Sequence, residues 1–309
     1  MFHIANTLQN NTENIFLTEL KPGDPNLLII DESLETKTAS VCELLVTLDA
    51  HIIQLGLREK RSNRILALET FPVKDDPKKI NWTETLEQLS RNSHLLRHFE
   101  FSKAIVGVFT ACYTLIPDSI FKEGDEKKFL DFNFSEKGLS QKVFSRQVNP
   151  FHLKTVFGIT DDLYHEIFHL FEEPELLHLS SALLIASHLQ SRGKTEKELF
   201  LHIRRNSIDL IALEGKKLLL MNTYDTPTAD DVLYFALMVC DQLELDPDSI
   251  PLRIAGEIEK ESMKYKLLYK YFRDIRYSER PGSVKYSYRF DKIPSHYNYS
   301  LFSLALCES

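Results

Sequence analysis

Hydrophobic residues gather in short runs along most of the chain, whereas the first forty residues are mainly polar and irregular, with one apolar run at 27–30. Beyond them, three apolar runs at 42–48, 51–57 and 64–71 are separated by very short polar connections. Connections this tight require successive strands to be antiparallel. The pattern therefore predicts a three-stranded meander.

The next segments alternate between helical and extended patterns. Asn81, followed by Glu84 three residues later, is typical of a helix start, and the helix is expected to reach about Asn92. The nearly continuous apolar run at 103–110 indicates a buried strand. Further segments are expected as a strand at 113–117, a helix at 119–131 and alternating stretches at 141–148 and 152–157.

A second pass through the same order begins near Glu198. Strands are predicted at 199–204, 208–213, 217–222 and 250–255, helices at 228–243 and 262–272, and a short strand at 275–277. The two passes superpose in a register that places Asp49 on Arg204, and the order β-β-β-α-β-α repeats. The repeat predicts a duplicated α/β architecture in which a cleft separates two halves.

The halves are expected to span residues 1–192, including the irregular N-terminal segment, and residues 193–309. The apolar helix predicted at 180–190 carries small residues that permit close packing, so we expect it to bind the halves together. The cleft is the place that this architecture offers to a ligand.

This order of elements resembles the actin and sugar-kinase superfamily, which uses a ribonuclease-H-like fold twice. The stretches 113–121, 217–224 and 230–237 resemble a bacterial family known as domain of unknown function 3822. That family is described as having an actin-like ATPase fold and no assigned activity. The resemblance covers about residues 40–300 and implies a duplicated ribonuclease-H-like (actin-like ATPase) fold.

Active members of that superfamily place an Asp and a Gly in each first hairpin, where they organise Mg²⁺ and let the backbone approach phosphates. Here Asp49 stands in the first hairpin without a nearby glycine, although Asp is also a common turn residue. The second hairpin offers Arg204 and Asn206, and the adenosine-binding Gly-Gly is reduced to Gly256. The resemblance therefore implies a degenerate nucleotide site at these four positions.

A ribonuclease-type nuclease would need several carboxylates converging on the central strands to hold two metal ions. The inner strands are expected to offer Thr47, His202 and Asn222 instead of Asp or Glu. The sequence therefore disfavours a nuclease.

The segment from His165 to His169 matches the H-E-x-x-H pattern, in which two histidines bind zinc and Glu166 would act as a general base. The apolar residues of this helix form one arc, however, and the histidines lie on the opposite, charged arc. No second signature supplies a third ligand. We therefore expect a surface helix and no metal, with a zinc site at His165 and His169 as the alternative.

The chain carries 37 Lys and Arg against 45 Asp and Glu, so its net charge of -8 disfavours nucleic acid as a partner. Residues 260–292 are the exception, because this segment contains ten basic and only four acidic residues, with tyrosines between them. The favoured interpretation is that long stems and phenol rings cover the second core. This segment is otherwise the one candidate surface for RNA or an anionic protein.

The four cysteines are far apart and fit reduced thiols. The N-terminus lacks signal-peptide features, and no window is apolar enough to span a membrane. We therefore expect a cytoplasmic, non-catalytic actin-like scaffold or interaction module that binds a protein partner and needs no cofactor. The alternatives are a divergent ATPase or small-molecule kinase that uses ATP and Mg²⁺ and, less favoured, a zinc-dependent hydrolase.

Overall fold

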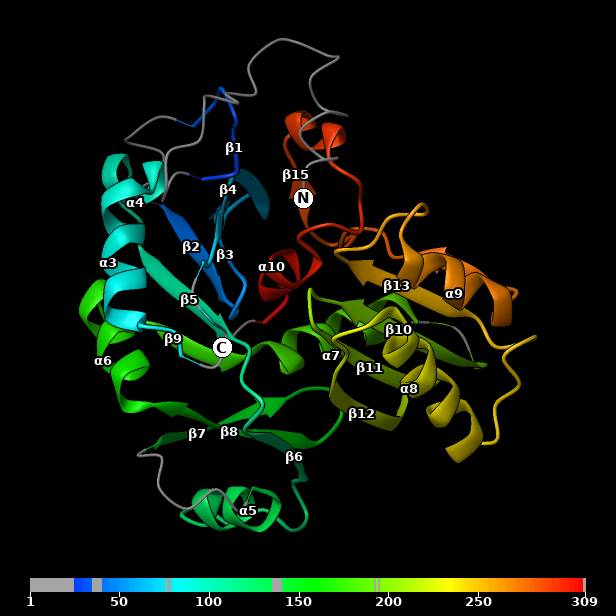
Figure 1. The fold of residues 1–309 in the computed structure, drawn as a ribbon. Coiled ribbons are helices and arrows are strands. Elements are labelled where there is room, and N and C mark those ends of the chain that lie inside the picture. The colour runs from blue at the N-terminus through cyan, green and yellow to red at the C-terminus, as the bar shows by residue number, and fades with distance from the viewer. Residues whose placement is uncertain are drawn as a thin grey trace.

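The computed structural model describes residues 25–34, 41–74, 76, 79–134, 141–191, 193 and 195–307. They form two mixed β-sheets that lie side by side, with a smaller antiparallel sheet below them in Figure 1. Most of the irregular segment expected at the N-terminus lies outside the described residues.

The first sheet has the strand order β1-β4-β3-β2-β5-β9, and β15 also pairs with β4. Its strands are β1 (Leu27–Ile30), β2 (Cys42–Leu48), β3 (Ile52–Glu59), β4 (Arg64–Pro72), β5 (Lys103–Val108), β9 (Glu175–His178) and β15 (Lys285–Tyr286). The predicted meander is confirmed, because β2, β3 and β4 pair antiparallel in sequence. β5 and β9 then add parallel strands on the other side of β2.

The second sheet repeats this arrangement with the order β12-β11-β10-β13-β14. Its strands are β10 (Lys197–Ile203), β11 (Ser207–Glu214), β12 (Lys217–Asp225), β13 (Leu252–Gly256) and β14 (Ile275–Tyr277). β10 corresponds to β2 and has the same length of seven residues. The predicted duplication is therefore confirmed strand by strand.

A small antiparallel sheet is inserted between β5 and β9. It consists of β6 (Tyr113–Pro117), β7 (Gln141–Val148) and β8 (Leu153–Thr160), and α5 (Glu126–Asn133) packs on it. The helix expected at 119–131 was wrong in its start, because residues 118–125 form turns before the helix. Gly124 has φ of +89° there, a conformation outside the right-handed helical range, so the α-helix cannot extend back through this residue.

Helices pack on both faces of each of the two larger sheets. They are α3 (Trp82–Asn92), α4 (His94–His98), α6 (Asp161–Leu170), α7 (Leu179–Gln190), α8 (Ala229–Gln242), α9 (Met263–Tyr271), the 3-10 helix η1 (Tyr288–Lys292) and α10 (Tyr299–Leu304). Two predicted helix starts are confirmed: Asn81 accepts a hydrogen bond from the Glu84 N–H, and Thr228 and Asp231 form a capping box.

Two helices cross between the halves. α7 follows β9 of the first sheet, yet its Leu183 and Leu184 pack with Phe200 and Ile211 of the second sheet. α10 follows the strands of the second sheet and packs with the core of the first sheet, as Figure 1 shows at the centre of the molecule. The expectation that residues 180–190 bind the halves together is therefore confirmed.

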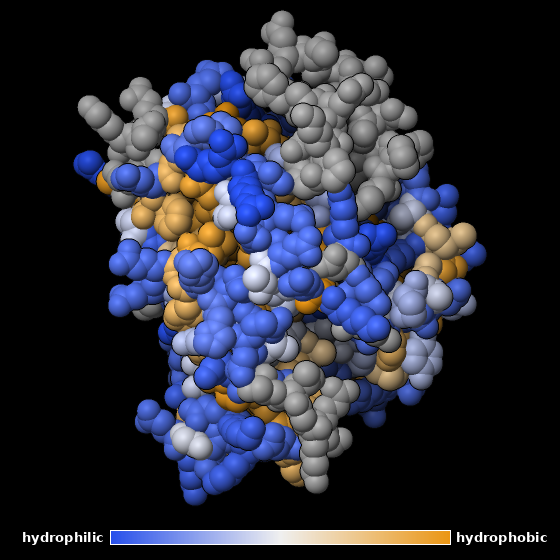
Figure 2. Space-filling view, turned by 60° about the vertical axis from the view of Figure 1, so that its left-hand side comes forward, coloured by the Kyte–Doolittle hydropathy of each residue, from blue (hydrophilic) through white to orange (hydrophobic). Residues whose placement is uncertain are grey.

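On the face shown in Figure 2, hydrophilic residues cover most of the surface and hydrophobic residues gather in a band on the left. Among the described residues, no helix is both long enough and apolar enough to span a membrane. The expected division at residues 192 and 193 stays a prediction, and residue 192 is outside the described part of the chain.

Candidate functional site

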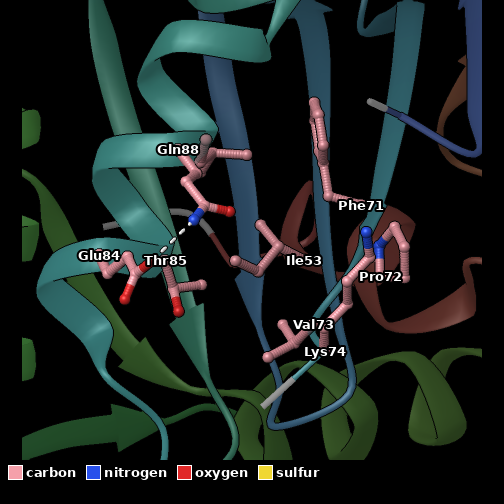
Figure 3. Close-up of a pocket in the computed structure, with 9 residues that line it drawn as sticks. Ile53, Phe71, Pro72, Val73, Lys74, Glu84, Thr85 and Gln88 are labelled. Carbon is pink, nitrogen blue, oxygen red and sulfur yellow. Dashed lines mark hydrogen bonds between the residues drawn. The ribbon is translucent and has the colours of Figure 1, made fainter. Parts of the chain in front are cut away.

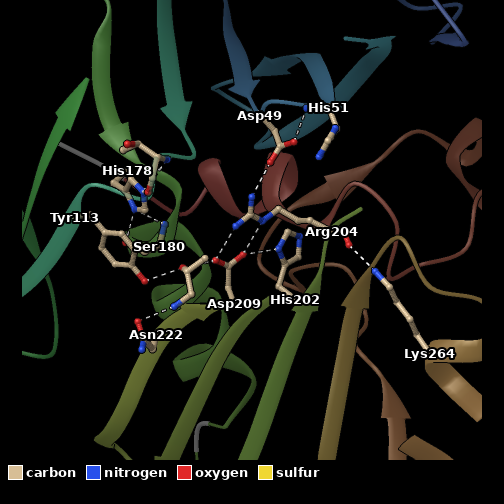
Figure 4. Close-up of polar contacts among 12 residues, drawn as sticks. Asp49, His51, Tyr113, His178, Ser180, His202, Arg204, Asp209, Asn222 and Lys264 are labelled. Carbon is tan, nitrogen blue, oxygen red and sulfur yellow. Dashed lines mark hydrogen bonds and ion pairs between the residues drawn. The ribbon is translucent and has the colours of Figure 1, made fainter. Parts of the chain in front are cut away.

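The first hairpins of the two halves meet between the sheets. Asp49 lies in the β2–β3 hairpin, and Arg204 occupies the matching place in the β10–β11 hairpin, 155 residues later. The Arg204 Nη1 donates to Asp49 Oδ2 at 2.8 Å, as Figure 4 shows. The two positions that the internal repeat superposes are thus joined by an ion pair.

A second carboxylate holds the same guanidinium from its own half. Asp209 on β11 accepts from Arg204 Nε at 3.1 Å and from Nη2 at 3.2 Å. His202 Nδ1 lies 3.0 Å from Asp209 Oδ2, and Thr223 Oγ1 donates to Oδ1 at 2.7 Å. Asp209 is fully buried, and the side chain of Arg204 is 16% exposed. The charged group is therefore enclosed and fully paired.

Aromatic rings complete the enclosure of Arg204. The guanidinium carbon of Arg204 lies 4.0 Å from the ring centroid of Phe109, just after β5. The His202 ring stacks on the Phe109 ring with 5.7 Å between the centroids. The Lys264 Nζ on α9 donates to the carbonyl oxygens of Arg204 and Arg205 at 3.0 and 2.9 Å. These contacts fix both the side chain and the hairpin that carries it.

A neighbouring contact ties the inserted sheet to the second half. The Tyr113 hydroxyl on β6 lies 2.9 Å from Thr223 Oγ1 on β12, and the Tyr113 ring stacks on His178 at 4.2 Å. Burial lowers the pKa of His178 to about 4, although a hydrogen bond to Thr110 opposes this. His178 is therefore neutral at pH 7 and acts as a hydrogen-bonding core residue.

The ion pairs keep Asp209 deprotonated although its side chain is buried. Burial would raise the pKa of Asp209, but the charge of Arg204 and the hydrogen bonds from His202 and Thr223 outweigh it. The pKa of Asp209 is consequently held far below its ordinary value, and the pKa of Arg204 is raised by Asp209 and Asp49 in spite of burial. Both groups stay charged over the physiological range.

We expect the stability of the protein to fall on acidification because of this pair. A carboxylate whose pKa is depressed in the folded state stabilises it above the unfolded pKa, about 3.9, and that contribution is lost as the pH falls below it. Urea unfolding between pH 7 and pH 3 should show this decline for the wild type. The decline should be smaller in Asp209→Asn, and an identical pH profile for the two proteins would contradict the assignment.

The structure brings together two of the four positions that the sequence nominated in the cleft. Asp49 and Arg204 are paired, whereas Asn206 is exposed and its carbonyl accepts from the Thr226 N–H at 2.8 Å. Gly256 ends β13 with φ of +95°, and its N–H donates to the His296 carbonyl at 2.8 Å. The amide of Gly256 therefore already has a partner from the C-terminal segment.

Sequence reasoning missed the residue that organises the site. The inner strands were expected to offer no Asp or Glu, and Asp209 shows that this expectation was wrong. The missing signal was available, because Asp209 interrupts an otherwise apolar strand, and a buried charge needs a partner. Phe109, which contacts Arg204, and Tyr113, which contacts Thr223, carried no such signal, because aromatic residues in apolar runs are typical of any core.

The H-E-x-x-H segment forms α6, as expected. His165 and His169 are exposed, Leu163 and Ile167 are buried, and Glu166 accepts a hydrogen bond from Thr83 Oγ1 at 2.9 Å. Within the described ranges, no group of three or more His, Cys, Asp or Glu side chains is arranged to hold a metal ion. The solvent-facing histidines match the surface helix that we expected, and a zinc site at this pair stays the alternative hypothesis.

The arginines of the basic segment make contacts within the chain. Arg273 pairs with Asp248, Arg276 with Asp274 and Arg289 with Glu32, while Arg280 donates to two backbone carbonyls. Tyr265 and Tyr277 stack at 5.8 Å over the second core. These contacts match the interpretation that the stems and rings of residues 260–292 cover the second half.

Two pockets lie away from the ion pair. One, shown in Figure 3, has an apolar floor of Ile53, Phe71 and Val73 and a polar rim that includes Glu84 and Gln88. The other lies between charged residues at the opposite end of the first sheet, including Glu43, Arg58 and Lys103. Neither pocket contains a residue that the sequence nominated.

Known structures resemble this architecture over nearly the whole chain. A Bacteroides thetaiotaomicron protein with an actin-like ATPase fold and unknown function superposes with a TM-score of 0.73 at 17% identity, covering 89% of this chain and 99% of that one. A chain of the PilM-PilN type IV pilus biogenesis complex superposes with a TM-score of 0.52 at 12% identity, covering 86% and 98%. These similarities establish the duplicated, actin-like ATPase fold that the order of elements implied.

No curated protein matches the sequence at a significant level. A family model described as "Protein of unknown function (DUF3822)" matches residues 31–275, which form most of both halves. The match covers the two hairpins that carry Asp49 and Arg204. The chain therefore belongs to the family of unknown function DUF3822.

Proposed function

We propose that this protein is a non-catalytic, actin-like interaction module whose cleft is closed by its own side chains. The observation that carries the proposal is the ion pair of Arg204 with Asp49 and Asp209. An arginine stands where the internal repeat and the superfamily pattern lead one to expect a second acid. Its positive charge neutralises the carboxylates that a Mg²⁺ ion would need.

The residues present do not fit a magnesium nucleotide. Phosphate binding requires free backbone N–H groups and space for a close approach. The Gly256 N–H donates to the His296 carbonyl at 2.8 Å, and the N–H of the next residue, Glu257, donates to the Ile203 carbonyl at 2.8 Å. Both backbone N–H groups at the end of β13 are therefore engaged within the chain, which supports a site that does not hold a nucleotide.

An inert body of this fold can still act through its surface. One structural neighbour is a chain of the PilM-PilN type IV pilus biogenesis complex. Fold similarity alone does not transfer that role. We take from this comparison only that a protein is the kind of partner we propose for this chain.

Thermal unfolding with increasing Mg-ATP tests the proposal. A ligand that binds the native state alone raises the midpoint in proportion to the logarithm of its concentration. We expect no change in Tm up to about 5 mM Mg-ATP, a concentration that would stabilise by about 2.7 kcal/mol at a Kd one hundred times lower. ATP hydrolysis should equal that of a buffer blank.

A concentration-dependent rise of several degrees would contradict the proposal and favour a divergent ATPase or kinase. The variant Asp49→Asn then identifies the place of binding. A rise that is lost in this variant would assign the nucleotide to the cleft, and a rise that persists would assign it elsewhere on the protein.

A further inference from the structure

Four aromatic rings of the second half lie in one column with nearly parallel planes. The centroids of the Tyr269 and Tyr265 rings are 6.0 Å apart with 15° between the planes, and those of Tyr265 and Tyr277 are 5.8 Å apart with 14° between the planes. Tyr277 stacks in turn on His296 with 4.1 Å between the centroids. The rings come from α9, β14 and the segment before α10, so the tertiary structure builds the column.

The two ends of the column differ in exposure. His296 at the inner end is buried, whereas Tyr269 at the outer end is 65% exposed. Figure 1 shows α9, which carries the outer ring, at the right-hand side of the molecule and away from the first sheet. Tyr265 and Tyr277 pack against the second core. Covering that core therefore accounts for these two tyrosines but not for an outer ring that stays in water.

Positive charge gathers on the face of α9 that carries Tyr269. Tyr269 and Lys270 follow Lys266 by three and four residues, so these three exposed side chains share one face of the helix. α9 contains no acidic residue, and among the described residues no ion pair engages Lys266 or Lys270. Lys264, by contrast, donates to backbone carbonyls within the chain. The exposed ring is therefore flanked by two cations that no described acid neutralises.

A planar ligand that carries phosphate groups matches this face better than an acidic peptide does. The face of a phenol ring has a negative potential, so it does not attract a carboxylate. A nucleobase can continue the column by stacking on Tyr269, and the neighbouring phosphates can pair with lysines. The net charge of -8 opposes this only locally, because salt screens charges more than about 8 Å apart at physiological ionic strength.

We propose that the outer face of α9 binds single-stranded nucleic acid, with one base stacked on Tyr269 and adjacent phosphates held by Lys266 and Lys270. Stacking accepts any base, so binding is tolerant of sequence. The inference goes beyond the proposed function and is independent of it, because it uses none of the side chains that close the cleft.

Fluorescence anisotropy of a labelled oligouridylate of about twelve nucleotides tests the proposal, a length within the usual range of single-strand sites. We expect a Kd on the order of 10⁻⁵ M at about 20 mM salt, and two phosphate contacts predict a slope of about −1.4 for the logarithm of the association constant against that of the salt concentration. Unchanged anisotropy up to about 500 µM protein would overturn the proposal. Equal binding of a duplex of the same length would also overturn it, because the bases of a duplex are stacked on one another.

Variants of the ring separate stacking from general attraction. Tyr269→Ala should weaken binding by about tenfold, and Tyr269→Phe should retain it because the aromatic face remains. Tyr288→Ala is the matched control and should bind like the wild type. Tyr288 lies in the same basic segment and is 60% exposed, but its hydroxyl donates to Glu32 at 3.0 Å. Equal binding by Tyr269→Ala and Tyr288→Ala would contradict the stacked base.

Variants of the lysines test the phosphate contacts. Lys266→Gln and Lys270→Gln should each reduce the magnitude of the salt slope by about 0.7, since each removes one contact to a single strand. Both lysines and Tyr269 are exposed, so Tm should not change in these variants. Binding that responds to the lysine variants but not to Tyr269→Ala would reveal a cationic patch for any polyanion, acidic peptides included, and would overturn the proposal.

Discussion

Replacing Arg204 with alanine is expected to lower the free energy of unfolding by about 3 kcal/mol or more. The change removes the one cation from between two carboxylates, Asp49 and Asp209, whose side chains are 4% and 1% exposed. Each would then be a buried charge without its partner, which costs far more than the loss of an exposed ion pair. Urea unfolding at pH 7 measures the loss.

The adjacent arginine supplies the control. Arg205 is exposed in the same hairpin, so Arg205→Ala should change the unfolding free energy by less than about 0.5 kcal/mol. Arg204→Lys should fall between the two, since lysine keeps the charge but loses the forked geometry that reaches two acids. Equal stabilities for Arg204→Ala and Arg205→Ala would show that the ion pair contributes nothing to the fold.

Replacing Gly256 with alanine is the second change with a large expected effect. Gly256 has φ of +95°, and a Cβ there would lie 2.1 Å from the carbonyl oxygen of Ile203 on the neighbouring strand. The clash is with backbone, which cannot rotate away, and strained backbone of this kind costs about 1–3 kcal/mol before any clash is counted. We expect a loss of about 3 kcal/mol in unfolding free energy.

A second glycine provides the matched comparison. A Cβ added to Gly282 meets no atom within 4 Å, so Gly282→Ala should leave the stability within about 0.5 kcal/mol of the wild type. Chemical denaturation of both variants in parallel separates the close approach from the general effect of alanine. A well-folded Gly256→Ala protein of wild-type stability would refute the requirement for glycine at the end of β13.

The architecture could be predicted from local patterns because the patterns are repeated and strong. Tight polar connections required antiparallel meanders, and the capping residues Asn81, Thr228 and Asp231 set two helix starts correctly. The superposition of the two passes also put Asp49 opposite Arg204 as matching positions. Hydrophobic periodicity and turn residues depend on only a few neighbouring positions, so they can be recognised in the sequence alone.

Contacts between distant segments could not be read in this way. That Asp49 and Arg204 touch, that Asp209 joins them and that His296 takes the Gly256 amide depend on how the halves are brought together by α7 and α10. Local propensity selects strands and helices, but burial and packing across the two sheets select which charged groups end up as partners, since a charge must find its counterpart wherever the fold excludes water.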